Sequence, residues 1–149
     1  MCQCCGGNGG PVDEIDLLRA FHGHLGPYVY AGLRMGKFAL GALNANPHFG
    51  MEVEVWCPAA TPRSCMLDGI QFSTGCTLGK QNIRHHPCDE DIRAVFLNRD
   101  TRQKMALRLR SEGMAKAVAE MDANGDEAGA AVVQSLPHRE LFEEIDPDG

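Results

Sequence analysis

Hydrophobic residues in the first third of the chain recur every three or four positions, the spacing of an amphipathic helix. We expect a first helix to begin near Pro11–Asp13 and to end at Gly23, because glycine readily adopts the left-handed conformation that closes a helix. A second helix should begin at Pro27, since proline fits a first turn, and fade by Asn44. The apolar faces of the two helices are formed by Ile15, Leu17, Leu18, Phe21, Val29, Leu33, Phe38 and Leu40.

Three glycines interrupt the second helix, at Gly32, Gly36 and Gly41. Glycine weakens a helix in isolation, so a helix that carries three of them needs another source of stability. We therefore predict that another backbone packs closely against this face.

Strict alternation of apolar and polar residues replaces the helical spacing at Met51–Cys57 and predicts a strand. Two further alternating runs, Ile92–Leu97 and Lys104–Leu109, flank Asn98–Arg102 and predict a hairpin. After the first strand, Thr61 should cap a helix that runs through residues 63–73. Pro62 would occupy its first turn and Gly75 would end it. Two more helices are expected at Ser111–Met121 and Glu127–Leu136.

This pattern contains no internal repeat and no domain boundary, so we expect one domain over residues 11–145. Residues 1–10 are rich in Cys and Gly and predict a flexible arm, and residues 146–149 predict a loose tail. At 149 residues and 44% hydrophobic content, the chain can build a core without disulfides.

The net charge of −6 argues against nucleic acid and anionic membranes as partners. No apolar run reaches the roughly 18 residues of a membrane span, and the first residues lack the basic and apolar segments of a signal peptide. The seven cysteines are odd in number and three lie at one end, unlike a disulfide framework. We therefore expect a cytoplasmic protein with free or metal-bound thiols.

Two histidines, His22 and His24, lie on either side of Gly23. On a continuous helix their side chains would point apart, and they can converge only if Gly23 breaks the helix. Neutral imidazoles on a rigid frame are suitable metal ligands. The alternative is that these histidines only favour the dipole at the end of the first helix.

Cys76 lies between Gly75 and Thr77, with Lys80 nearby. A thiol close to a cation has a lowered pKa, and the thiolate is the form that binds metals or attacks substrates. The alternative is a buried cysteine that acts as a small hydrophobic residue.

Cys65 is a second candidate thiol, and Asp68 follows it by three residues. A straight helix would hold Cys65 and Cys76 roughly 16 Å apart, so they could share one metal only if the chain folds back at Gly75. A third group of thiols, Cys2, Cys4 and Cys5, could bind soft metals or be part of a disordered tail. The remaining candidate, His85-His86-Pro87-Cys88, is expected in a loop, where metal binding and an incidental role are equally consistent with the sequence.

Two stretches of the chain resemble the FmdE family, whose members are related to one component of formylmethanofuran dehydrogenase. The first begins Phe21-His-Gly-His-Leu-Gly-Pro-Tyr and continues to Gly32-Leu-Arg-Met-Gly36. The second is Cys65-x-x-Asp-Gly-Ile-Gln followed by Thr74-Gly-Cys-Thr-Leu-Gly-Lys-Gln-Asn82. The resemblance covers roughly residues 13–110.

The resemblance implies an α+β fold with a mostly antiparallel sheet packed with helices, commonly in a homodimer. It also implies a metal, zinc in the usual assignment, although iron or nickel would suit similar ligands. The implied ligands are His22 or His24 with Cys76, and Cys65 close by. Many members have a cysteine where this chain has Gly26, so one thiol ligand of the family is missing here. No cysteine follows Cys88, so we expect this chain to be without the Cys-rich zinc module that larger members carry after this domain.

Three functions are consistent with these residues. The first is a metal-binding accessory protein of a molybdenum or tungsten dehydrogenase, of the formylmethanofuran or formate type, or of metalloenzyme metabolism, with oxidoreductase proteins as partners. The second is a small metal- or thiol-dependent enzyme with its site at Cys76 and His24, in which Lys80 or Arg34 binds an anion. The third is a redox or metal sensor that uses the N-terminal cysteines. The sequence assigns no catalytic residue.

Overall fold

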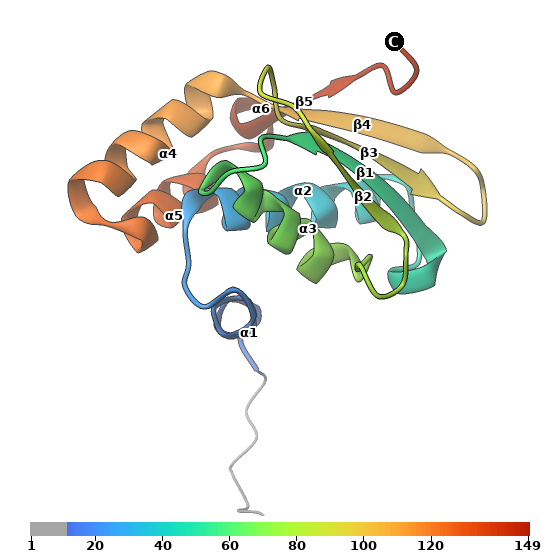
Figure 1. Cartoon of the computed structure of the whole chain (residues 1–149), viewed down its shortest axis with the longest axis horizontal. Coiled ribbons are helices and arrows are strands. Elements are labelled where there is room, and N and C mark those ends of the chain that lie inside the picture. Colours follow the sequence, from blue (N-terminus) through green and yellow to red (C-terminus); the bar gives the residue numbers. More distant parts are fainter. Residues whose placement is uncertain (1–11) are drawn as a thin grey trace, which may run out of the picture.

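A computed structural model describes residues 12–149 and shows helices packed on a single sheet (Figure 1). The N-terminal cysteines, and with them the sensor hypothesis, lie outside the described residues. The helices are α1 (Glu14–His22), α2 (Pro27–Ala42), α3 (Met66–Thr74), α4 (Ser111–Asn124), α5 (Asp126–Ser135) and α6 (His138–Leu141). The strands are β1 (Met51–Cys57), β2 (Ile83–Pro87), β3 (Arg93–Asn98), β4 (Lys104–Leu109) and β5 (Phe142–Ile145), and two 3-10 turns are η1 (His48–Gly50) and η2 (Arg63–Cys65).

The five strands lie in the order β2-β1-β3-β4-β5. Only β1 and β2 are parallel, and the other neighbouring pairs are antiparallel. The helices α2 and α3 cover one face of this sheet, while α4 and α5 lie beside them at one end (Figure 1). The expected α+β fold with a mostly antiparallel sheet is therefore confirmed.

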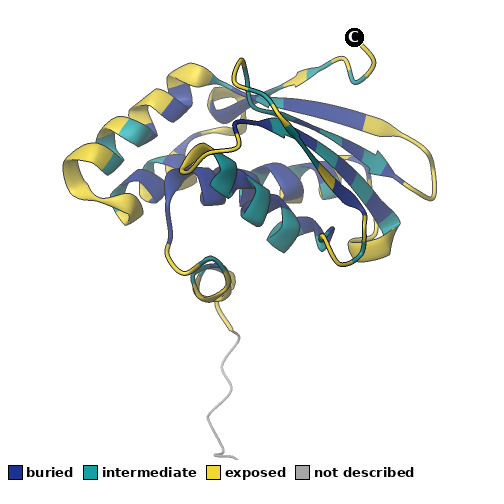
Figure 2. Ribbon diagram, viewed as in Figure 1, coloured by how far each residue is buried: buried dark blue, intermediate teal, exposed yellow. Residues whose placement is uncertain are grey.

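The core lies between the sheet and α2. Alternate residues of β1 are buried, as the strict alternation in the sequence predicted. The helix α2 is buried along most of its length, whereas α1 projects from the body and is largely exposed (Figure 2). Between Val12 and Gly149, no helix is both long and apolar enough to cross a membrane.

Close packing of α2 on α3 explains two of the three glycines in α2. A side chain at Gly32 would overlap the backbone carbonyl of Met66, and one at Gly36 would overlap the hydroxyl of Ser73. Gly69 of α3 faces the backbone of α2 in the same way. The prediction was wrong for Gly41, because no described atom outside its neighbours and its own helix backbone lies within 4 Å of where its side chain would begin.

Three local predictions from the sequence need correction. Thr61 does not cap α3: the backbone N–H of Cys65 bonds to the carbonyl of Pro62 at 3.0 Å, so a 3-10 turn precedes the helix. His85 and His86 lie in strand β2 and not in a loop. β2 was missed because Ile83 is its only apolar residue besides proline, and backbone pairing with β1 holds it in the sheet. The short strand β5 was also missed.

Candidate functional site

His22 is the last residue of α1, and its side chain is only 8% exposed. Its Nδ1 lies 2.6 Å from Oδ2 of Asp68, in the first turn of α3. Its other ring nitrogen, Nε2, is buried and has no hydrogen-bond partner within the described part of the chain. A buried polar atom without a partner costs about 1–3 kcal/mol, so this nitrogen is the most unusual feature of the site.

His24 lies beside His22, with a distance of 4.7 Å between the ring centroids. Gly23 adopts a left-handed conformation (φ 97°) that ends α1, and this break brings the two rings together. Half of the His24 side chain is exposed, and its Nε2 lies 3.8 Å from a carboxylate oxygen of Asp126 at the start of α5.

Cys65 completes this cluster from the end of η2. A small cavity of about 20 Å³ is bordered by His22, His24, Cys65 and Asp126. Burial raises the pKa of the Cys65 thiol, and the carboxylates of Asp68 and Asp126 raise it further. The thiol therefore keeps its proton at neutral pH unless a cation displaces it.

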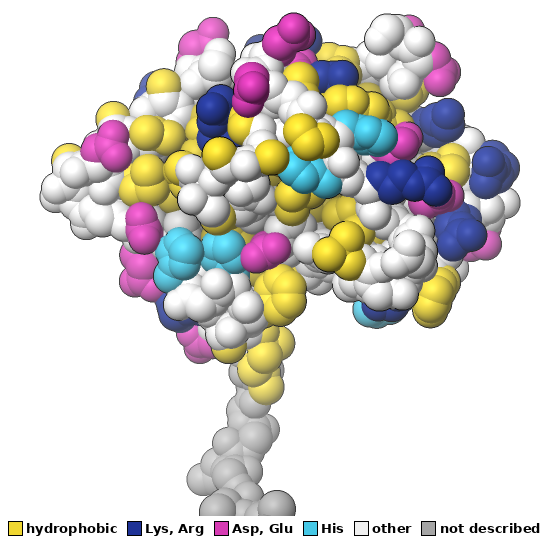
Figure 3. All heavy atoms as spheres, viewed as in Figure 1, with side chains coloured by type: hydrophobic (Ala, Val, Ile, Leu, Met, Phe, Trp, Pro, Cys, Tyr) yellow, Lys and Arg dark blue, Asp and Glu magenta, His cyan; other side chains and the backbone are white. Residues whose placement is uncertain are grey.

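A larger cavity of about 400 Å³ adjoins two residues of this cluster, His22 and Cys65. His22, Cys65 and Asp68 border it on one side, and Ile83 and His85 of β2 border it as well. On the face of the molecule shown in Figure 3, histidine side chains gather at two places.

His22, His24 and Cys65 are residue types that bind transition metals, but their side chains are not arranged around one metal position. Among residues 12–149, no three His, Cys, Asp or Glu side chains are arranged closely enough to hold a metal ion as they lie. Nitrogen and sulfur donors suit zinc, and the free Nε2 of His22 is an available donor. The residues that could hold a metal here are His22, His24 and Cys65, which border the same small cavity.

Cys76 does not join the histidines, in contrast to the sequence-based pairing of Cys76 with His24. It is fully buried just beyond the end of α3, and its thiol lies 3.4 Å from the carbonyl oxygen of Met51. Asp68, which holds His22, is eight residues away near the other end of α3, about 12 Å by helical rise. Burial raises the pKa of Cys76, and the nearby charge of Lys80 lowers it less than burial raises it.

The two cations proposed from the sequence as anion binders do not border the cavities that adjoin His22. Nη1 of Arg34 donates hydrogen bonds to the carbonyl oxygens of Val133 and Leu136, at the end of α5, at 2.6 Å each. Lys80 lies over the ring of Phe49, with Nζ 6.0 Å from the ring centroid. Arg34 therefore holds α2 to the end of α5.

His85 was considered from the sequence only as part of the run His85–Cys88 and was not placed at this site, and Asp126 was not selected. The Nε2 of His85 lies 3.0 Å from the carbonyl oxygen of Cys57 and 3.4 Å from the Cys57 thiol. Burial raises the pKa of Cys57 to about 11, so that thiol stays neutral. Had β2 been recognised as a strand, His85 could have been found from the sequence. Side chains alternate along a strand, so Ile83 and His85 lie on one face.

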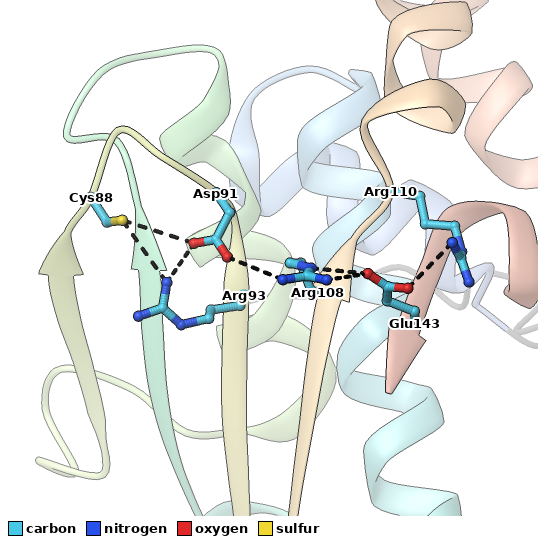
Figure 4. A network of polar contacts seen from close by, with 6 residues as sticks. All are labelled: Cys88, Asp91, Arg93, Arg108, Arg110 and Glu143. Atoms are coloured by element: carbon cyan, nitrogen blue, oxygen red, sulfur yellow. Dashed lines mark hydrogen bonds and ion pairs between the residues drawn. The ribbon is translucent and has the colours of Figure 1, made fainter. Parts of the chain in front are cut away.

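A chain of ion pairs forms a separate polar cluster at the ends of the strands (Figure 4). Arg108 bonds to Glu143 at 2.6 Å and lies 3.9 Å from Asp91, which also pairs with Arg93. The hydrogen bond from Arg108 lowers the pKa of Glu143. Most of these charges neutralise one another across β3, β4 and β5, which indicates a role in holding the strand ends together.

Two sequence comparisons found relatives of this chain, and the family match covers the region that forms the site. Residues 21–145 match the family described as FmdE, Molybdenum formylmethanofuran dehydrogenase operon. A probable S-adenosyl-L-methionine-binding protein of Archaeoglobus fulgidus is 39% identical over 87 residues, which are 56% of this chain and 24% of that protein. The chain thus spans about a quarter of that relative's length. Because the family match covers most of the chain, this protein belongs to the FmdE family, which is associated with formylmethanofuran dehydrogenase.

Proposed function

We propose that this protein is a metal-binding accessory protein of a formylmethanofuran-type dehydrogenase, and that His22, His24 and Cys65 bind a divalent transition metal, zinc in the first instance. The single observation that carries the proposal is the buried Nε2 of His22, which has no partner among the described residues. Family membership supports the association with the dehydrogenase.

The contact between His22 and Asp68 supports a ligand role. A carboxylate accepts a hydrogen bond, so the proton of the neutral ring lies on Nδ1 and the lone pair on Nε2 stays free. Histidines that bind metals usually donate their other ring N–H to such an acceptor, which fixes the tautomer and the ring orientation. The thiolate of Cys65 would add a soft donor, which favours zinc over magnesium or calcium.

Metal content of matched cysteine variants tests the proposal. The parent should be the full chain without a histidine tag, with Cys2, Cys4 and Cys5 replaced by serine so that their thiols do not bind metal. We expect about one zinc per parent chain by elemental analysis, loss of zinc in Cys65→Ala and retention in Cys76→Ala. A metal-free parent would contradict the whole proposal, and loss in Cys76→Ala alone would refute the role of Cys65.

The raised pKa of Cys65 predicts a pH dependence of zinc affinity. Because the thiol is protonated below its pKa, zinc must displace that proton, and the apparent affinity should rise about tenfold per pH unit. The slope is measured between about pH 7.5 and 8.5, and comparison with a variant that lacks the thiol assigns it. Competition with a chelating dye should show the slope in the parent and its absence in Cys65→Ala; an unchanged slope would exclude Cys65 as a ligand.

A second candidate function is a small metal-dependent enzyme. The cavity of about 400 Å³ that adjoins His22 and Cys65 favours it, since an accessory metal site needs no space for a substrate. The site would then lie at Cys65 and His22, because Cys76 is buried at the far end of α3.

A further inference from the structure

The cavity of about 400 Å³ is lined by both apolar and polar side chains. Leu67, Leu78 and Ile83 supply apolar surface. None of the described residues that line it is a lysine or an arginine. Its carboxylate, Asp68, is bound to His22 at 2.6 Å, so it is already engaged.

His85 lines this cavity, and its ring has one nitrogen that can accept a hydrogen bond. Its Nε2 lies 3.0 Å from the carbonyl oxygen of Cys57, and a carbonyl can only accept. The proton of the neutral ring is therefore on Nε2, where it also faces the Cys57 sulfur at 3.4 Å. The remaining nitrogen, Nδ1, carries a lone pair and makes no hydrogen bond to any residue between Val12 and Gly149.

We propose that this cavity binds an uncharged molecule with an apolar body and an N–H or O–H group, and that His85 selects it by accepting that hydrogen at Nδ1. The inference deepens the proposed function, because His22 and Cys65 border the same cavity and would hold the metal beside the bound molecule. Binding at His85 does not itself require the metal.

The charges around the cavity explain why the ligand is not an anion. A carboxylate or phosphate would lose its hydration on entry and find no cation among the described lining residues to replace it. It would also face the negative charge of Asp68. A molecule that lacks a donor would leave Nδ1 of His85 without a partner, which should weaken its binding about fivefold.

Three probes of nearly equal shape separate these features: benzamide is neutral with an N–H donor, acetophenone is neutral without one, and benzoate is an anion. Each would be titrated into the full chain after metal removal, with amide chemical shifts measured by NMR. We expect benzamide to bind with a Kd on the order of 1 mM, as its small size implies. Acetophenone should bind about fivefold more weakly, a difference of one hydrogen bond. Benzoate should bind most weakly.

The variant His85→Phe, with His86→Phe as its matched control, assigns the hydrogen bond to one residue. His86 is the next residue of β2, stacks on Trp56 at 4.6 Å and does not line the cavity. His85→Phe should weaken benzamide about fivefold and leave acetophenone unchanged, while His86→Phe should change neither.

Several results would overturn the inference: no saturable binding of benzamide, equal binding of benzamide and acetophenone, or benzoate binding as tightly as benzamide. Equal losses in the two histidine variants would overturn it as well. If His85→Phe does not fold, the three probes on the unaltered chain still decide. Because the probes are tested without metal and zinc content is measured separately, failure of this inference leaves the metal proposal intact, and the reverse holds too.

Discussion

Replacement of His22 by alanine is expected to lower the affinity for zinc by at least about 100-fold. Changes to residues that only orient a metal ligand already cost about 10–100-fold, and loss of a ligand should cost more. His22 has the buried Nε2 and the supporting contact to Asp68, whereas His24 is half exposed. The His24→Ala variant should therefore lose affinity as well, but by a smaller factor.

The matched control for these variants is His138→Ala. His138 lies in α6 beside the ring of Phe38, with a centroid distance of 5.1 Å, and lines neither cavity that adjoins His22. Zinc affinity, measured by competition with a chelating dye, should be unchanged in this variant. Equal losses in the three variants would show that the zinc is bound elsewhere, and no loss in His22→Ala would remove this histidine from the site.

Replacement of Gly32 by alanine should destabilise the fold by about 3 kcal/mol, at the upper end of the cost of overpacking a core. The added Cβ would overlap the carbonyl oxygen of Met66 and the backbone nitrogen of Ile70, and neither backbone can move aside without separating α2 from α3. For a chain of this length, the change should lower the melting temperature by about 10 °C.

Gly41→Ala provides the opposite case within the same helix. Gly41 is exposed and its side-chain position is open, so alanine should stabilise the protein by about 0.5–1 kcal/mol through better helix propensity. Urea unfolding followed by circular dichroism measures both variants. Equal effects of the two substitutions would contradict the close contact between α2 and α3 at Gly32.

The elements that the sequence predicted well are those with strong local signals. Gly23 and Gly75 end α1 and α3 in the left-handed conformation, as their positions after amphipathic runs implied. The alternation in Met51–Cys57 predicted the strand correctly, since one face of β1 is buried. β2 had no such signal, because its place in the sheet depends on a partner strand almost thirty residues earlier in the chain.

The candidate site was predicted in part. The glycines around Cys76 suggested an accessible thiol, but Gly75 ends a helix and lies against the ring of His48, and the Cys76 side chain is fully buried. Cys65 was the second candidate because a straight helix would hold it roughly 16 Å from Cys76, which the glycines marked as the main thiol. Its place beside His22 depends on the contact of α1 with the start of α3, which joins residues more than forty positions apart.

The sequence by itself therefore determined the five helices α1 to α5, three strands and the histidine pair, because each is specified by residues within a few positions of one another, whereas the short helix α6 was missed. Only the tertiary structure decided which thiol accompanies those histidines, and it brought His85 to the same cavity. The physical reason is that burial and proximity depend on how α3 and β2 pack against distant segments. A cysteine between glycines is buried or exposed according to that packing, and local spacing carries no information about it.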